Sequence, residues 1–298
     1  MKNSINKELP EGIRYIRKED KAFPEKLLEL HDCPKGIYVR GNLPDPSKKS
    51  VAIVGARMCS AYGRATASYF ARVLAAHDIQ IISGLALGVD GAAHEGALMA
   101  KGKTFAVMAG GCDIIYPRSH VGLYENIRTT GGIISEEPCG YPPIAKMFPK
   151  RNRIISILAD IVLVVEARKK SGSLITADFA AEQGRDIFAV PGRLEDELSR
   201  GCNELIEQGA GIAISPERML EIMGENPKKS DNSKIFMQNV LAREENIVYS
   251  CLSLQPQSLE KLCSDTKLPI QCVTEAVMLL QLKGLAKEIG RNRYVKVT

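Results

Sequence analysis

The chain has 298 residues, of which 45% are hydrophobic and 25% charged, and its net charge of 40 − 35 = +5 indicates a nucleic-acid partner only weakly. This composition excludes disorder as the main state, and a chain of this length can bury one large core plus a small second domain. No apolar run approaches the roughly 20 residues of a membrane helix, and the first residues, MKNSINKELPEG, contain no apolar signal segment, so we expect a cytoplasmic protein without membrane contact.

The eight cysteines are scattered along the chain and form no C-x-x-C pair. This spacing matches neither a zinc site nor a disulfide framework. We therefore expect reduced thiols and no bound metal.

Residues 1–49 are predicted to be an N-terminal lead-in segment, with one helical stretch near residues 25–31 and a short apolar run at residues 37–39. From residue 50 to residue 223, short β-branched runs that end near glycine alternate with stretches of helical periodicity. This alternation is typical of βαβ units, so we predict an α/β domain with a doubly wound, mostly parallel sheet. The expected strands are Val51–Val54, Gln80–Ile82, Thr104–Met108, Gly132–Ile134, Ile161–Val165, Ile187–Val190 and Gly211–Ile214.

Residues 224–237 combine polar residues, glycine and proline, and we expect a linker there. Residues 238–298 follow as a small domain with three helical segments and a hairpin, the helix–helix–helix–wing order of a winged-helix domain. A helical protein-docking module of the same size is the alternative. The expected elements are Val240–Leu252, Ser258–Ser264, Ile270–Lys283, Leu285–Ile289 and Arg293–Val297.

The strand-to-helix loops are the candidate site, because ligands bind at the carboxyl edge of a doubly wound sheet. After the first strand of the α/β domain, Gly55 allows a tight turn, Arg57 supplies a cation, and Ser60 caps a helix whose free N–H groups suit a phosphate. After the second strand, Ser83 and Gly84 begin a loop whose two glycines, Gly84 and Gly88, let the backbone approach a ligand closely.

The most basic stretch of the chain lies between residues 141 and 170, where seven Lys or Arg stand against two acids, a local excess of 7 − 2 = +5. Phe148 lies among these cations, and an aromatic ring flanked by cations suits a sequence-tolerant site for a single nucleic-acid strand. Cations at a helix start oppose the helix dipole unless an anion binds there, and a second anion site opens the next helix. The residues assigned to these two sites are Lys146, Phe148, Lys150, Arg151, Asn152, Arg153, Lys170, Ser171, Gly172, Ser173 and Thr176.

Several enzyme motifs are incomplete. Residues 96–104 resemble a P-loop, but five residues instead of four separate the glycines, and the segment precedes a strand. His94 begins an H-E-x-x-H pattern, but Leu98 stands where the second histidine belongs, so a hydrogen-bonded scaffold role fits His94 better than catalysis. No G-x-G-x-x-G follows the first strand of the α/β domain. We therefore expect neither an ATPase, a zinc hydrolase nor a dehydrogenase, and no cofactor.

Five motifs follow one another between residues 50 and 215: Val54-Gly55-Ala56-Arg57, Ser83–Asp90 with His94, Phe148-Pro149-x-Arg151-Asn152-Arg153, Ser171–Ala177, and Val190-Pro191-Gly192. Together they resemble the DNA-processing protein A (DprA/Smf) family. The resemblance implies an extended Rossmann-like domain that binds single-stranded DNA, acts as a homodimer and protects incoming DNA. It also implies that the protein helps load the RecA recombinase during natural transformation and has no catalytic activity.

Matched residue by residue, the family's basic pocket falls on Arg57, its aromatic on Phe148 and its Arg-Asn-Arg run on residues 151–153, with residues 171–173 beside them. Some members carry a pocket lysine three residues before the aromatic. This chain has Ala145 there, and Lys146 is offset by one position.

Two other functions stay open at this point. Related Rossmann-like proteins hydrolyse nucleoside monophosphates with a P-G-G-x-G-T-x-x-E loop, but the corresponding turn here, residues 170–176, lacks the proline and the double glycine. A nucleotide sensor would need a tight pocket for one mononucleotide.

For the winged helix, two roles stay open. Weak contact with duplex DNA through a basic wing competes with docking of a protein.

Overall fold

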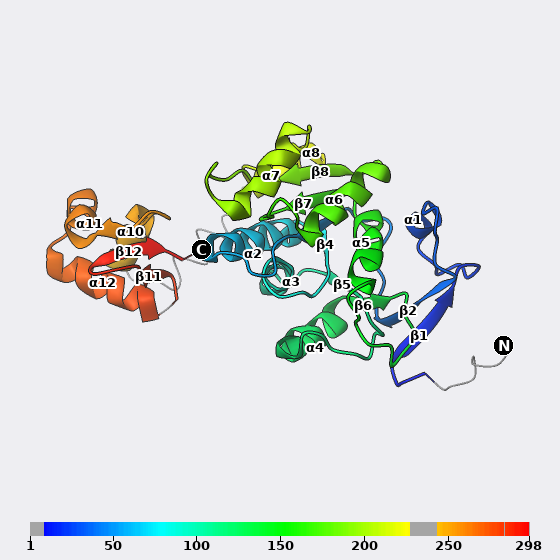
Figure 1. Cartoon of the computed structure of the whole chain (residues 1–298). Coiled ribbons are helices and arrows are strands. Elements are labelled where there is room, and N and C mark those ends of the chain that lie inside the picture. Colours follow the sequence, from blue (N-terminus) through cyan, green and yellow to red (C-terminus); the bar gives the residue numbers. More distant parts are fainter. Residues whose placement is uncertain (1–8, 227–242, 283, 298) are drawn as a thin grey trace. The chain divides into compact units, whose positions relative to one another are not determined.

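The computed structural model describes residues 9–226, 243–282 and 284–297 (Figure 1). The chain divides into two compact units, Met1–Asn226 and Pro227–Thr298, which we describe separately. Residues 227–237 of the expected linker and residues 240–242 of the expected first C-terminal helix lie outside the described residues.

The larger unit is built on a nine-stranded sheet in the order β1-β2-β6-β5-β4-β3-β7-β8-β9. Strands β3 to β9 pair in parallel, whereas β2 pairs antiparallel with both β1 and β6. Every residue of β3 to β7 is buried, which confirms the α/β, mostly parallel fold that the continuous apolar runs predicted. The strands are β1 (Ile13–Arg17), β2 (Gly36–Gly41), β3 (Ser50–Val54), β4 (Gln80–Ser83), β5 (Thr104–Met108), β6 (Gly132–Ser135), β7 (Ile161–Val164), β8 (Asp186–Ala189) and β9 (Gly211–Ile212).

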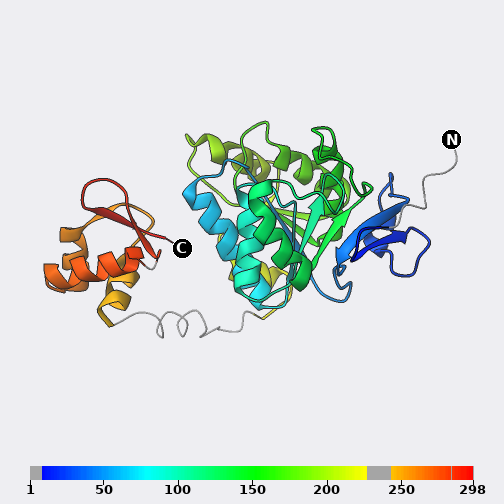
Figure 2. The ribbon, with the colours of Figure 1, turned by 90° about the horizontal axis from the view of Figure 1, so that it is seen from below.

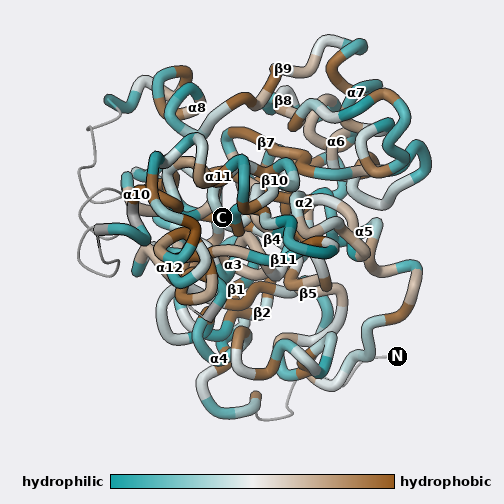
Figure 3. Tube along the Cα trace, turned by 90° about the vertical axis from the view of Figure 1, so that its left-hand side faces the viewer, coloured by the Kyte–Doolittle hydropathy of each residue, from teal (hydrophilic) through white to brown (hydrophobic). Residues whose placement is uncertain are grey.

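Alternate residues of each strand face opposite sides of the sheet and enter two separate cores. Val51 and Ile53 join the core under α2, α3 and α8, whereas Ala52 and Val54 join the core under α5, α6 and α7. Helices therefore lie on both sides of the sheet (Figure 2), and strands such as β7 form hydrophobic, brown segments in Figure 3. The helices are α1 (Glu25–Leu28), α2 (Ala61–Ala76), α3 (Val89–Met99), the 3-10 helix η1 (Arg118–His120), α4 (Val121–Thr130), α5 (Met147–Leu158), α6 (Gly172–Glu182), α7 (Glu197–Glu207) and α8 (Pro216–Ile222).

The N-terminal residues, which we expected to form a lead-in segment, extend the sheet. β1 pairs with β2, and β2 continues onto β6 through pairs such as Val39 with Ile134. In β1 only Ile13 and Ile16 are buried, three residues apart. The strand therefore lacks the period-two alternation by which a strand is predicted from sequence. The helix expected near residues 25–31 is limited to α1.

His94 lies buried in α3 and has the hydrogen-bonded scaffold role that the sequence predicted. Its Nδ1 is 2.6 Å from the hydroxyl of Thr104, which donates its own proton to the Ile81 carbonyl at 3.0 Å. Nδ1 is therefore the donor to Thr104. Burial, with smaller contributions from the charges of His120 and Arg151, lowers the pKa of His94 to about 3. The imidazole is neutral in the folded protein and joins α3 to β4 and β5.

The smaller unit has, among its described residues, three helices and a three-stranded sheet in the order β10-β12-β11. Val248, Leu262, Val273 and Leu280 form the centre of its core. β11 and β12 pair antiparallel, so the helix–helix–helix–wing order is the one expected from the sequence. The elements are α10 (Arg243–Cys251), β10 (Gln257–Ser258), α11 (Leu259–Thr266), α12 (Ile270–Leu282), β11 (Ala286–Glu288) and β12 (Arg293–Lys296).

The neutral state of His94 predicts a loss of stability in mild acid. The unfolded chain takes up a proton on this side chain near pH 6.5, whereas the folded protein resists protonation down to about pH 3. The contribution of His94 is complete above pH 6.5 and falls as the pH decreases, by up to about 1.4 kcal/mol per pH unit. Urea unfolding between about pH 7.5 and about pH 5 should show this decline, and His94→Gln should reduce the slope by a similar amount. Equal slopes in the two proteins would contradict the assignment.

Candidate nucleic-acid interface

A cavity of about 670 Å³ opens at the carboxyl edge of the parallel strands, where the loops after β3, β4 and β5 meet the starts of α5 and α6. Doubly wound sheets bind their ligands at this edge. The cavity brings together most of the site residues predicted from the sequence. Those that line it are Gly55, Arg57, Phe148, Arg151, Asn152, Lys170, Ser171, Gly172, Ser173 and Thr176.

Arg57 and Phe148 contact each other in this cavity. The guanidinium carbon of Arg57 lies 4.5 Å from the centre of the Phe148 ring, which is a cation–π contact. Phe148 also contacts Tyr116, with ring centres 5.9 Å apart and an interplanar angle of 62°. Among the described residues Arg57 forms no ion pair, so its charge is available to a ligand. Tyr116 follows β5 and was not among the residues assigned from the sequence; its one signal was an aromatic ring in a strand-to-helix loop.

Arg151 lines the cavity but is buried, with only 6% of its surface exposed. Its Nη1 donates to the Gly84 carbonyl at 2.8 Å and also to the Val107 carbonyl, so it links the ends of β4 and β5. Burial lowers the pKa of Arg151 to about 10, and the group stays charged near neutral pH. The nearby Asp90 partly offsets this lowering of the Arg151 pKa. Burial raises the pKa of Asp90 itself, and its side chain accepts a hydrogen bond from the Gly84 N–H at 3.1 Å. Arg151 therefore supports the floor of the cavity.

Lys150 and Arg153 do not line the cavity, and both pair with acids. Lys150 Nζ lies 3.0 Å from Glu137 and 3.3 Å from Glu136. Arg153 is buried and lies 2.7 Å from Glu136 and 2.8 Å from Asp32. These acids precede the basic stretch in the sequence, so the local charge count did not include them. The anion expected at the start of α5 is thus supplied in part by the protein itself.

Two predicted hydroxyl ligands make hydrogen bonds within the protein. The Ser60 hydroxyl donates to Glu166 at 2.5 Å, and the Ser60 N–H donates to the same carboxylate at 2.8 Å. A buried carboxylate therefore lies at the start of α2, where we expected a phosphate. Ser83 donates its hydroxyl to the Ile53 carbonyl at 2.6 Å. Neither serine lines the cavity, and neither does Lys146, which is exposed just before α5.

The start of α6 forms one wall of the cavity. Ser171 caps the helix: its Oγ accepts from the Ser173 N–H at 3.4 Å and lies 2.8 Å from the Ser173 hydroxyl. Asn152 donates to the Gly172 carbonyl at 3.1 Å and so joins α5 to α6. Lys170 is exposed just before the cap and forms no ion pair among the described residues. This wall presents an ammonium, hydroxyls and helix N–H groups, which together suit a phosphate.

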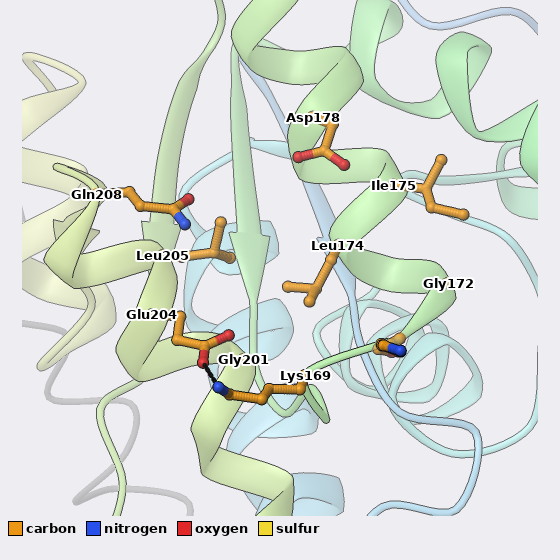
Figure 4. Close-up of a pocket in the computed structure, with 11 residues that line it drawn as sticks. Lys169, Gly172, Leu174, Ile175, Asp178, Gly201, Glu204, Leu205 and Gln208 are labelled. Carbon is orange, nitrogen blue, oxygen red and sulfur yellow. Dashed lines mark ion pairs between the residues drawn. The ribbon is translucent and has the colours of Figure 1, made fainter.

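A second cavity, of about 430 Å³, lies between α6 and α7 and shares residues 170–172 with the first. Figure 4 shows Leu174 and Leu205 between the two helices, with the ion pair between Lys169 and Glu204 below them. The two atoms of this ion pair are 2.8 Å apart. The two cavities therefore adjoin across the start of α6.

The part of the chain that the structure describes contains no group of three or more His, Cys, Asp or Glu side chains that could hold a metal ion. All eight cysteines are unpaired thiols. Of the described helices, none is long and apolar enough to cross a membrane.

Known proteins are similar to this chain in sequence and in fold. The family model for DNA recombination-mediator protein A matches residues 14–224. The chain is 43% identical over 207 residues to Protein Smf of Escherichia coli (strain K12) and 41% identical over 201 residues to the DNA processing protein DprA of Streptococcus pneumoniae. These matches cover 69% and 67% of this chain. They cover 55% of the E. coli protein and 71% of the S. pneumoniae protein, so the chain matches little more than half the length of the former.

Two solved structures are similar as well. The X-ray structure of DNA processing protein A from S. pneumoniae has a TM-score of 0.67 and 39% identity, with 71% of this chain and 74% of that chain covered. DNA processing protein A from Helicobacter pylori, whose structure was described for its single-stranded DNA binding mode, has a TM-score of 0.62 and 32% identity and is covered to 95%, against 70% of this chain.

The mostly parallel sheet, with helices on both of its sides and a cavity at its carboxyl edge, defines a Rossmann-like protein. The chain belongs to the DNA recombination-mediator protein A (DprA/Smf) family. The family resemblance seen in the sequence motifs is thereby confirmed.

The position of Arg151 predicts that its loss destabilises the fold. Arg151→Met leaves the buried carbonyls of Gly84 and Val107 without their donor, which should cost about 1–3 kcal/mol for each carbonyl. Lys150→Met, one position earlier, removes a half-exposed cation and should cost less than about 1 kcal/mol. Urea unfolding of the two variants checks this difference. Similar stabilities would show that Arg151 does not hold the strand ends together.

Proposed function

We propose that the protein binds single-stranded DNA in the cavity at the carboxyl edge of its sheet. The observation that carries this proposal is a free cation, Arg57, on the ring of Phe148, which itself contacts Tyr116, inside one cavity. Each nucleotide of an unpaired strand offers a charged phosphate and the flat face of a base, so a site for it needs cations beside rings. The described binding mode of the H. pylori relative supports the same ligand.

The phosphates of the strand contact Arg57 and the start of α6 in this proposal. Lys170 supplies the second free cation, and the Ser171 cap supplies hydroxyl and N–H donors beside it. Arg168, 4.0 Å from Glu197, adds a weakly paired cation to the same wall. Arg151 supports this surface, since its Nη1 donates to two backbone carbonyls and its Nε donates to Asn152 at 3.3 Å.

The wider role that we propose follows from family membership. The protein acts in the cytoplasm as a homodimeric recombination mediator, which protects incoming DNA and helps load the RecA recombinase during natural transformation. No catalytic step belongs to this proposal. The competing function is binding or hydrolysis of a single nucleotide in the same cavity.

Two substitutions test the phosphate contacts. Arg57→Ala should weaken binding of an unstructured thymidine oligonucleotide by about 1–3 kcal/mol, because it removes a phosphate contact and the cation on the Phe148 ring. Lys170→Ala should weaken binding by about 1 kcal/mol, and each change should reduce the slope of log K against log salt by about one unit. Fluorescence anisotropy at several salt concentrations measures both quantities.

The matched control is Lys101→Gln, which removes an exposed cation in the turn before β5, at the opposite edge of the sheet. Its affinity and salt slope should stay close to those of the unaltered protein. Unchanged binding by both Arg57→Ala and Lys170→Ala would contradict the proposed site. Saturable binding of a mononucleotide, without binding of the oligonucleotide, would favour the nucleotide-sensing or nucleotide-hydrolysing alternative.

A further inference from the structure

Phe148 is less open to a ligand than its place in the motif suggests. The guanidinium of Arg57 lies over its ring at 4.5 Å, and Tyr116 contacts the same ring. Phe148 is only partly exposed, whereas Tyr116 has 46% of its surface exposed. A base that stacks on the covered face of Phe148 must first displace Arg57 and lose the cation–π contact.

Tyr116 lies on a loop that is fastened on both sides of it. Before it, Asp113 accepts a hydrogen bond from the Gly140 N–H at 2.9 Å. After it, the Nδ1 of His120 lies 3.1 Å from the Leu85 carbonyl. A ring held in this way is already oriented, so a ligand that stacks on it costs little conformational entropy.

The surroundings of Tyr116 also suit a flat, uncharged group. Ala86, Pro143 and Ala145 line the same cavity, and all three have small apolar side chains. The free cations Arg57 and Lys170 lie on the loop after β3 and just before α6. The loops after β4, β5 and β6 therefore bring apolar groups and the Tyr116 ring to the cavity, whereas the loops after β3 and β7 bring its free cations.

We propose that Tyr116 is the base-stacking residue of the site, while Phe148 is a positioning residue that holds Arg57 against the phosphates. This inference rests on the proposed binding of single-stranded DNA. The group that Tyr116 takes is an unpaired nucleobase of any kind, because every base has a face that can stack. Arg57 and Phe148 then act on the charged backbone, and Tyr116 acts on the base.

An oligonucleotide of abasic sites separates these roles, because it keeps the phosphates and lacks the rings. Tyr116→Leu should weaken binding of a thymidine oligonucleotide roughly tenfold and binding of the abasic strand by less than about twofold. Phe148→Leu should weaken binding of both strands by similar factors, because it releases Arg57. Tyr116→Phe keeps the ring and should bind like the unaltered protein. Equal effects of Tyr116→Leu on the two strands, or no effect on either, would overturn the assignment.

A spectroscopic test uses the absence of tryptophan from the chain. Tyr116→Trp introduces the only tryptophan of the chain, which can be excited selectively over the tyrosines. Its emission should be quenched by the thymidine oligonucleotide and not by the abasic strand. Tyr15→Trp is the control, since Tyr15 is also exposed and also contacts a ring, Tyr38 at 4.7 Å, but lies on β1. Binding without quenching at position 116 would overturn the stacking role and leave the proposed function standing. Failure of the unaltered protein to bind either strand would overturn the proposed function itself.

Discussion

One buried guanidinium, that of Arg151, holds the carboxyl edge of the sheet in place. It donates to the carbonyls of Gly84 and Val107 at the ends of neighbouring strands, and Asp90 opposes its charge. Gly84 lies beneath the cavity and does not line it, and a Cβ there would lie 2.5 Å from the Arg151 guanidinium, so the close approach needs glycine. Buried carbonyls and a buried charge are costly without partners, so loss of either side of this arrangement destabilises the other. Arg57 and Tyr116 line the same cavity as Arg151, whose hydrogen bonds hold the strand ends next to it.

The basic residues near the cavity fall into two groups, those bonded to oxygens of the protein and those without such partners. Arg151 and Arg153 are buried and bonded to the protein's own oxygens, and Lys150 pairs with nearby glutamates. Arg57 and Lys170 are exposed and lack such partners among the described residues. A phosphate backbone releases counterions only where it meets free cations. In the proposed site, the electrostatic contribution to DNA binding comes from the loop after β3 and the start of α6. The cations at positions 150, 151 and 153 of α5 are bonded within the protein instead.

Strands β3 to β7 could be predicted because each is a continuous buried run, and the carboxyl-edge rule then located the cavity. β1 could not be predicted, since its two buried isoleucines are three residues apart and so lack the period-two alternation of a strand. The roles of residues 150–153 could not be separated either. Successive residues on a helix point about 100° apart, so one basic run faces a cavity, a strand end and two glutamates at once. Tyr116 contacts Phe148 only in the folded protein, and the same holds for the acids that pair with Arg153. Spacing along the chain shows neither contact.

Photo-crosslinking can show whether single-stranded DNA binds at the carboxyl edge of the sheet, because it locates the strand on the intact protein. A thymidine oligonucleotide with one iodouracil is irradiated in complex with the full chain, and the crosslinked peptides are identified by mass spectrometry. We expect crosslinks in the loop that carries Tyr116 and at the start of α5 around Phe148. Crosslinks confined to residues 243–297, or to the Lys150 side of α5 without Tyr116, would contradict it.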